Sequence, residues 1–196
     1  MADAELWSRA VAGDAAAFTV FYQRHADKVF THCWRRTDSA TDSEDLTAEV
    51  FAVAWRKRAT ITLHEDVDIL PWLLTTANFL LRHYHRSLRR ARQLVRKFPR
   101  DTGLPDIAEE VADEQHGHYA AALALNTLNQ LRIADREIIE LCVIQGLTPA
   151  AVASASGEPA GTVRARLSRA LARARALYEQ LEVPESGPSH VEGGAR

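Results

Sequence analysis

The 196-residue sequence has few features of secreted or membrane-bound proteins. Its two cysteines, Cys33 and Cys142, lie far apart, which fits reduced thiols better than a disulfide framework. No apolar run approaches the ~18 residues that a membrane-spanning helix requires. The N-terminus also lacks the basic start and apolar core of a signal peptide. These absences predict a cytoplasmic protein without a membrane segment.

The sequence also lacks the motifs of common enzyme chemistry. It contains no glycine-rich phosphate loop, no nucleophile elbow and no C-x-x-C or H-x-x-x-H pair. His25, His32 and Cys33 could suggest a metal site, but the remaining ligands are not evident. We therefore expect no enzymatic activity, no cofactor and no bound metal.

The chain does contain a strong local asymmetry of charge, which the net charge of −2 conceals. From Arg82 to Arg100 there are eight basic residues and no acid. From Asp101 to His118 there are six acids and no lysine or arginine. Proline and glycine interrupt this second stretch, so residues 97–118 are predicted to be a flexible acidic linker.

The segments on either side of this linker have helical periodicity. We predict an all-α fold made of two small helical domains, at residues 1–96 and 119–182. Asp14 is expected to cap a helix of the first domain, and Asp135 a helix of the second. Residues 183–196 are rich in proline, glycine and serine and are predicted to form a disordered tail.

The stretch from Gly146 to Arg175 predicts a helix-turn-helix. Thr148 followed by Pro149 is typical of a helix start, with a capping hydroxyl and a proline in the first turn. Gly157 then ends this short helix, since glycine tolerates a left-handed conformation, and a longer helix follows. Such a layout is typical of DNA-binding proteins.

The second helix of this motif has two distinct sides. Its apolar side carries Val163, Leu167, Ala170, Leu171 and Ala174. Its opposite side carries Thr162, Ala165, Arg166, Arg169 and Arg173, with Arg164 and Arg175 on a flank. Residues 159–175 contain five arginines and no acid, whereas a solvated face usually alternates in sign. We therefore expect contacts with guanine edges and phosphates rather than a merely solvated helix.

Residues 41–58 form a predicted helix with acids at its start and bases at its end, as the helix dipole favours. Thr41 and Glu44 match a capping box. Leu46, Val50 and Val53 form one apolar line, while Phe51 and Trp55 lie on another side. Such a helix is either buried inside a small domain or shared with a partner, and the pattern does not decide between the two.

Another long helix is predicted to start at Pro71, after an irregular stretch at residues 59–70. Its first half is apolar, and its second half combines arginines with His83, Tyr84 and His85. Rings beside cations suit single-stranded nucleic acid, because rings stack on bases and cations bind phosphates. A solvated basic helix end is the alternative.

Two blocks of this sequence resemble the extracytoplasmic-function (ECF) sigma factors. LWSRAVAGDAAAF, SEDLTAEVFAVAWRKR, PWLLTTAN and RHYHRSLRR, between residues 6 and 92, resemble sigma region 2. LRIADREIIELCVIQGLTPAAVA and SGEPAGTVRARLSRALARAR, within residues 123–178, resemble region 4. The order of the blocks and the acidic linker between them also match this class.

The resemblance implies a subunit that binds core RNA polymerase, through the β′ clamp helices and the β flap, and directs transcription from specific promoters. It implies polymerase-binding residues in the first domain: Asp45, Leu46, Glu49, Val50 and Trp55. It implies −10 contacts by Asn78, Arg82, His83, His85, Arg86, Arg89 and Arg90. It implies −35 contacts by Thr162, Arg164, Ala165, Arg166, Arg169 and Arg173. It also suggests an anti-sigma factor as a further partner.

Three positions depart from the family pattern. Phe79 occupies the place where these factors usually have asparagine, and Asn78 precedes it. Ala151 replaces a common acid, and Ala165 replaces a frequent serine. A free-standing helix-turn-helix regulator is the alternative function, but it usually needs a dimer to match two half-sites. It would also leave the region 2 blocks unexplained.

Overall fold

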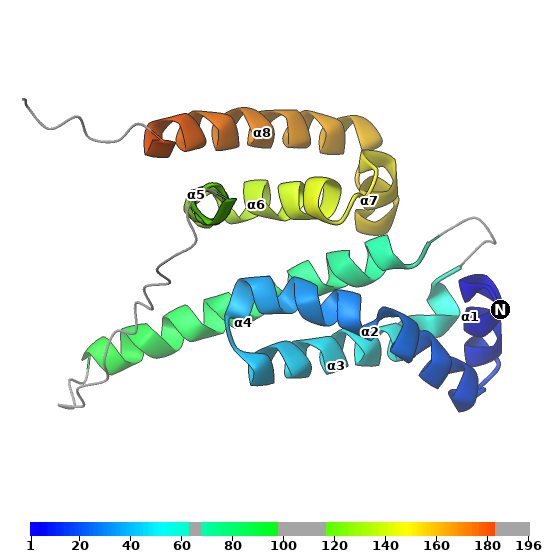
Figure 1. The fold of residues 1–196 in the computed structure, drawn as a ribbon. Helices are drawn as coiled ribbons and strands as arrows, with labels where there is room; N and C mark the ends of the chain where they lie inside the picture. The colour runs from blue at the N-terminus through cyan, green and yellow to red at the C-terminus, as the bar shows by residue number, and fades with distance from the viewer. Residues whose placement is uncertain (63–67, 98–116, 183–196) are drawn as a thin grey trace, which may run out of the picture. The chain divides into compact units, whose positions relative to one another are not determined.

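The computed structural model describes residues 1–62, 68–97 and 117–182, and every regular element in these ranges is helical (Figure 1). The elements are α1 (Asp3–Val11), α2 (Ala15–Thr37), α3 (Ala40–Lys57), η1 (Arg58–Thr60), α4 (Leu70–Lys97), α5 (Gly117–Gln130), α6 (Ile133–Ile139), η2 (Glu140–Ile144), α7 (Pro149–Ser156) and α8 (Ala160–Glu182). The predicted all-α fold is confirmed. The predicted tail and nearly all of the predicted linker lie outside the described residues, but Lys97 and residues 117–118 are helical.

The chain divides into two compact units. The described residues of Met1–Leu104 and Leu147–Ala160 form the first, and those of Pro105–Gly146 and Gly161–Arg196 form the second. This division places α7 in the first unit, whereas the sequence indicates a second domain at 119–182 that includes it. The domain boundaries therefore remain a prediction.

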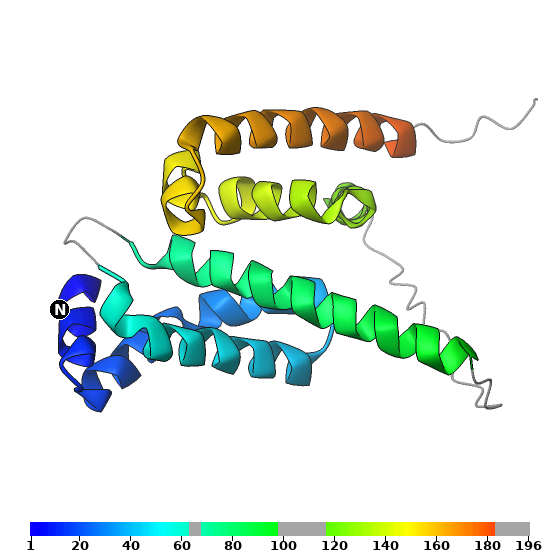
Figure 2. The ribbon, with the colours of Figure 1, turned by 180° about the vertical axis from the view of Figure 1, so that it is seen from behind.

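The core of the first unit is built by α1, α2, α3 and α4, with α2, α3 and α4 packed side by side (Figures 1 and 2). Trp7 of α1 is 2% exposed, and its ring centroid lies 5.0 Å from that of Phe21 on α2. The Trp7 Nε1 atom donates a hydrogen bond of 3.0 Å to the Ile61 carbonyl, just after η1. Burial of these rings joins α1 to the helices that carry the candidate surfaces.

Helix capping in this unit agrees with the sequence at one position and differs at another. The Asp14 carboxylate caps α2 by accepting from the Ala17 backbone N–H at 3.0 Å, as predicted. The predicted capping box at Thr41 and Glu44 is wrong, because α3 is capped by Ser39 instead. Asp38 ends α2 at φ 52°, which leaves Ser39 extended with its hydroxyl over the new first turn.

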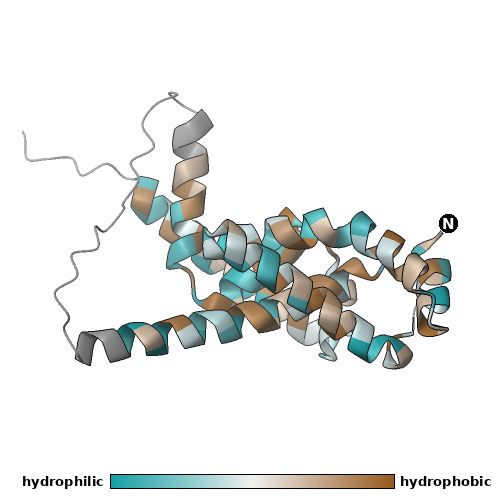
Figure 3. Cartoon of the chain, turned by 90° about the horizontal axis from the view of Figure 1, so that it is seen from below, coloured by the Kyte–Doolittle hydropathy of each residue, from teal (hydrophilic) through white to brown (hydrophobic). Residues whose placement is uncertain are grey.

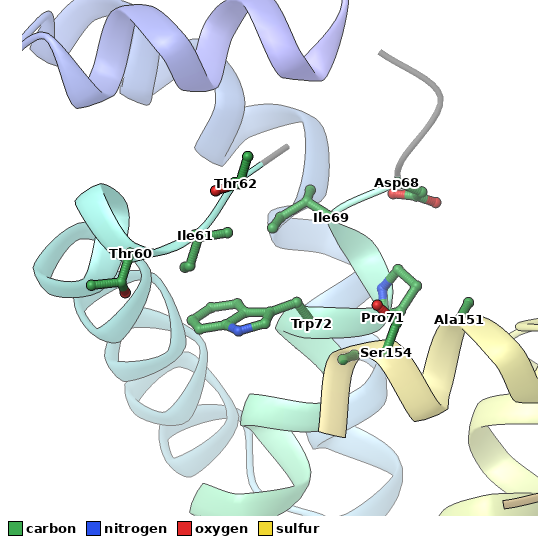
Figure 4. Close-up of a pocket in the computed structure, with 10 residues that line it drawn as sticks. Thr60, Ile61, Thr62, Asp68, Ile69, Pro71, Trp72, Ala151 and Ser154 are labelled. Carbon is green, nitrogen blue, oxygen red and sulfur yellow. The ribbon is translucent and has the colours of Figure 1, made fainter. Parts of the chain in front are cut away.

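A pocket of about 510 Å³ opens in the first unit, where the chain after η1 and the start of α4 approach α7 (Figure 4). The Trp72 indole extends beneath Ile61, and Ala151 and Ser154 contribute the α7 side. Among the described residues that line this pocket, Asp68 alone is charged. The described lining thus combines one carboxylate with the hydroxyl groups of Thr60, Thr62 and Ser154.

In the second unit α8 lies along α6 (Figures 1 and 2). The buried apolar side chains of this unit are Leu123, Leu131, Ile138, Ile139, Leu141, Val163 and Ala170. Asp135 does not cap a helix, contrary to the prediction, because α6 begins two residues earlier, at Ile133. The Asp135 side chain is instead buried beneath α8 and paired with it.

No helix in the described part of the chain is long and apolar enough to cross a lipid bilayer.

Candidate nucleic-acid and partner surfaces

One side of α4 exposes a row of four arginines and one histidine, which we name the basic face. It consists of Arg82, His83, Arg86, Arg89 and Arg90, all of which are exposed. The opposite side is buried, with Leu73, Ala77 and Leu81 at 0% exposure. The helix contains no Asp or Glu between Leu70 and Lys97, so no acid within α4 offsets these charges. Figure 3 shows hydrophilic and hydrophobic residues alternating along its distal part, as one helix with two different sides requires.

Asn78 does not belong to this surface, which corrects the prediction of a −10 contact there. Its side chain is 3% exposed and lies between α4 and α2. His32 Nε2 donates to Asn78 Oδ1 at 2.8 Å, and Arg36 Nη1 donates to the same oxygen at 3.4 Å. The Asn78 amide oxygen thus accepts hydrogen bonds from two buried side chains of α2. Turning Asn78 towards solvent would remove this acceptor from both of them.

His85 is half-buried and lies beside Tyr84, at a centroid distance of 5.2 Å. The Tyr84 hydroxyl donates to the Asp42 carboxylate in the first turn of α3 at 2.8 Å. Burial and this hydrogen bond raise the pKa of Tyr84 above its usual value, so the hydroxyl keeps its proton at a higher pH than a free tyrosine does. The hydrogen bond between Tyr84 and Asp42 therefore joins α4 to α3 at the margin of the basic face.

The predicted polymerase-binding residues on α3 separate into exposed and buried positions. Asp45 and Glu49 are exposed and lie one turn apart, and we name them the acidic pair. Leu46 is half-buried, so part of its side chain borders this exposed surface. Val50 is 0% exposed, so the prediction that it contacts a partner is corrected: it packs in the core.

The aromatic residues of α3 pack mainly against α2. Phe51 is 3% exposed and meets Tyr22 at a centroid distance of 4.6 Å. Trp55 is half-buried, with its ring 4.9 Å from Phe18 and the Arg58 guanidinium 4.1 Å above it. Burial inside the domain, one of the two open interpretations, therefore explains Phe51 fully and Trp55 in part.

The first three turns of α8 expose most of the predicted DNA-reading residues. Thr162, Arg164, Ala165 and Arg169 are exposed, and Arg166 is half-buried. Val163 and Ala170 are 0% exposed on the other side, as the apolar periodicity predicts. Leu171 departs from that pattern, because it remains 42% exposed. The helix follows a three-residue turn, in which Gly157 adopts φ 73°, the left-handed conformation expected of it.

Arg173 forms an ion pair between α8 and α6. Its Nη1 atom donates to both carboxylate oxygens of Asp135, at 2.8 and 2.7 Å. Asp135 is 5% exposed, so the arginine neutralises a buried charge and ties α8 to α6. The Arg173 side chain nevertheless remains 48% exposed, so the predicted DNA contact stays a prediction beside this structural ion pair. No local sequence pattern links two residues that lie 38 positions apart.

The cluster of His25, His32 and Cys33 does not converge on one point. His25 Nε2 lies 2.8 Å from Asp3 Oδ2, whereas His32 binds Asn78. Among the described residues, no group of three or more His, Cys, Asp or Glu side chains is arranged to hold a metal ion. These histidines bond to other helices of the unit.

Comparisons with known proteins match both halves of the chain. Residues 21–112 match the family model for Sigma-70 region 2, and residues 122–173 match that for Sigma-70 region 4. The RNA polymerase sigma factor NccH of Alcaligenes xylosoxydans xylosoxydans is 32% identical over 189 residues, covering 92% of this chain and 97% of that protein. The region 4 match includes both α7 and the start of α8.

Two solved structures share the fold. CnrH, solved with the cytosolic domain of CnrY, aligns with a TM-score of 0.63 and 22% identity over 92% of this chain and 99% of CnrH. The sigma factor RpoE of Bartonella quintana, solved with the anti-sigma factor NepR, gives a TM-score of 0.54 and 23% identity over 83% and 96%. These likenesses support the helical fold.

Proposed function

The chain belongs to the sigma-70 family, within its extracytoplasmic-function class, and we propose which of its surfaces bind the −35 element, the −10 element and core polymerase. A member of this family binds core RNA polymerase and directs transcription initiation at specific promoters. It acts with the polymerase, and we propose that it has no catalytic activity of its own and works in the cytoplasm. The observation that carries the proposal is the presence, in one chain, of both matched regions with exposed arginines on the second helix of region 4.

We assign −35 recognition to the exposed part of α8. Thr162, Arg164, Ala165, Arg166 and Arg169 occupy its first half, in the helix that follows the Gly157 turn. A helix entering the major groove presents its N-terminal residues to base edges, and arginine suits guanine and phosphate. Ala165 offers only a small apolar contact, which suits a thymine methyl better than a hydrogen-bonding edge.

We assign binding of the −10 strand to the basic face of α4. Its cations are solvent-exposed and lie on one side of a helix that lacks acids, an arrangement that favours the DNA backbone. Asn78 supports this face from inside, through its hydrogen bonds to α2. His85 sits at the edge of the face and contributes less to it.

We assign docking on the polymerase β′ clamp helices to the acidic pair on α3, with Leu46 and the exposed part of Trp55 beside it. Asp45 and Glu49 are exposed, and the Glu49 partner Arg56 is itself exposed, so solvent screens this ion pair. Charges in such positions contribute to association rate and specificity more than to fold stability. Region 4 is assigned to the β flap by family membership alone.

An anti-sigma factor is a further proposed partner, since the structure of RpoE with NepR shows such a complex for a protein of the same fold. The acidic stretch between the two regions lies outside the described residues. Its proposed role, by resemblance, is to occupy polymerase channels that later hold RNA.

Run-off transcription with purified core polymerase on a genomic fragment library tests the function. The proposed sigma factor yields discrete transcripts that depend on both proteins and share a −35 and −10 motif. A free-standing regulator would instead bind DNA without core polymerase and give no transcripts. The variant carrying Asp45→Ala and Glu49→Ala is the matched comparison, because it alters the docking surface and leaves α8 intact.

A further inference from the structure

Trp72, in the first turn of α4, differs from the other three tryptophans of the chain. Trp7, Trp34 and Trp55 each have an aromatic neighbour, at centroid distances of 5.0, 6.0 and 4.9 Å. Within the part of the chain that the structure describes, Trp72 has neither a ring neighbour nor a hydrogen bond. It is half-buried and lines the pocket of about 510 Å³ (Figure 4). Its indole face and its N–H group are therefore accessible to an occupant of this pocket.

The apolar walls beside this indole are fixed by the rest of the unit. Ile61 lies above Trp72 in Figure 4, and its carbonyl accepts the hydrogen bond from Trp7 Nε1 at 3.0 Å. Ile69 and Pro71, which line the same pocket, are buried. These walls are held in place before any ligand arrives, which lowers the entropy cost of binding.

The charge of the lining selects the class of ligand. Asp68 is exposed, and its Oδ1 atom accepts from the Leu70 backbone N–H at 2.8 Å, which holds the carboxylate in position. No lysine, arginine or histidine is among the described residues that line the pocket. A ligand that carries a phosphate or a carboxylate would therefore meet an acid and no compensating cation.

An organic cation satisfies both the indole and the carboxylate. Ammonium groups bind over the face of tryptophan more strongly than over other aromatic rings, and Asp68 supplies the opposite charge. The volume of about 510 Å³ lies in the range of small-molecule pockets, so a hydrocarbon body fits beside the ammonium group. A metal ion would find only one carboxylate among the described lining residues, fewer charged ligands than such sites use.

We propose that this pocket binds a small organic cation, in which an ammonium group is attached to an aromatic or branched apolar body. The ammonium group binds between Trp72 and Asp68, and the body fills the apolar part of the pocket. Because Ala151 and Ser154 of α7 also line the pocket, an occupant contacts both α7 and the start of α4 and stabilises their packing. This site is separate from the surfaces assigned to DNA and polymerase.

The test compares three probes that share a phenyl ring on a two-carbon arm and differ in charge. They are phenethylamine, which is a cation at pH 7, neutral 2-phenylethanol and anionic 3-phenylpropionate. Calorimetric titrations of the full chain measure the dissociation constant for each probe. We expect phenethylamine to bind about 5- to 30-fold more tightly than 2-phenylethanol, the range that a partly desolvated cation–π contact supplies. 3-Phenylpropionate should bind least tightly.

Five variants identify the residues responsible. Asp68→Asn removes the charge and keeps an oxygen that can accept from the Leu70 N–H, and it removes most of the preference for the cation. Trp72→Leu removes the ring and has the same effect, whereas Trp72→Phe keeps a ring and retains part of the preference. Trp34→Leu and Asp27→Asn change an exposed tryptophan and an exposed acid of α2, and both leave the preference unchanged.

Three results would overturn the proposal: no detectable binding of phenethylamine, equal affinity for phenethylamine and 2-phenylethanol, or tightest binding of 3-phenylpropionate. A preference that survives both Asp68→Asn and Trp72→Phe unchanged, with Trp72→Leu also unaffected, would place the cation elsewhere and would overturn it too. Circular dichroism shows whether each variant folds, and the conservative Asp68→Asn keeps the test decisive if Trp72→Leu does not. Because the titrations contain neither polymerase nor DNA, they can fail while run-off transcription succeeds.

Discussion

Replacing Arg173 with alanine should lower the free energy of unfolding of the second unit. The Arg173→Ala change removes the donor of two hydrogen bonds, of 2.8 and 2.7 Å, to the Asp135 carboxylate. Asp135 has a side chain that is only 7% exposed, so its charge would remain in the interior without this arginine. α8 would then lose these two hydrogen bonds to α6.

The magnitude follows from the unequal burial of the two partners. Breaking a fully buried pair by removing one partner costs about 3–5 kcal/mol, whereas an exposed pair contributes about 0–1 kcal/mol. The Arg173 side chain is 48% exposed, so water already screens part of the interaction and hydrates Asp135 once the arginine is removed. We expect a loss of about 1–2 kcal/mol in the free energy of unfolding, between these two limits.

The distribution of tryptophan makes this loss measurable in the full chain. All four tryptophans, Trp7, Trp34, Trp55 and Trp72, lie in the first unit. In a urea titration, tryptophan fluorescence therefore reports unfolding of the first unit, while far-ultraviolet circular dichroism reports helices of both. Arg173→Ala should shift part of the dichroism transition to lower urea and leave the fluorescence transition unchanged.

Arg175→Ala is the matched control on the same helix. Arg175 pairs with Glu179 at 3.0 Å, but the two side chains are 84% and 62% exposed, so the loss should stay below about 0.5 kcal/mol. If Arg173→Ala left both transitions unchanged and weakened −35 binding as Arg166→Ala does, the arginine would belong to the DNA-reading surface after all. The ion pair with Asp135 would then have no structural role.

Three other changes test separate surfaces. Arg166→Ala should weaken holoenzyme binding to the promoter by about 1–3 kcal/mol at a single −35 base pair, measured with a panel of single-base promoter variants. Asp45→Ala with Glu49→Ala should weaken binding to core polymerase without lowering the melting temperature, because both side chains are exposed. Burial raises the pKa of the Cys33 thiol from 9.0 to about 11, so native Cys33 should react slowly with iodoacetamide at pH 8. For the same reason, the stability that the neutral thiol provides is present below pH 9 and lost as the pH rises through about 11.

Each of these predictions has a contrary outcome. Uniform loss across all −35 variants would make Arg166 a phosphate contact. Undiminished polymerase affinity would remove the acidic pair from the interface. Equal alkylation rates of Cys33 in the native chain and in urea would show that the thiol is accessible. Comparing the pH dependence of unfolding for the wild-type chain and Cys33→Ala isolates the contribution of this thiol.

Local sequence patterns determined much of this protein. Thr148 caps α7 through its hydroxyl, Pro149 starts the helix, and Gly157 ends it in the left-handed conformation. Each of these effects involves only the residue itself and the nearest turn. The Asp14 cap and the buried side of α8 were predictable for the same reason. The charge reversal near residue 100 was likewise visible in the sequence alone.

Only the tertiary structure decided which polar residues face solvent. Asn78 precedes the exposed Phe79 and looked available to DNA, yet it is buried because His32 and Arg36 on another helix use its amide oxygen. Asp135 looked like a cap and Arg173 like a DNA contact, yet they pair across 38 residues. Helical periodicity places a side chain on a face, but its partners come from elements that are distant in the chain. The free energy of burying a charge or an amide depends on those partners, and no local pattern contains them.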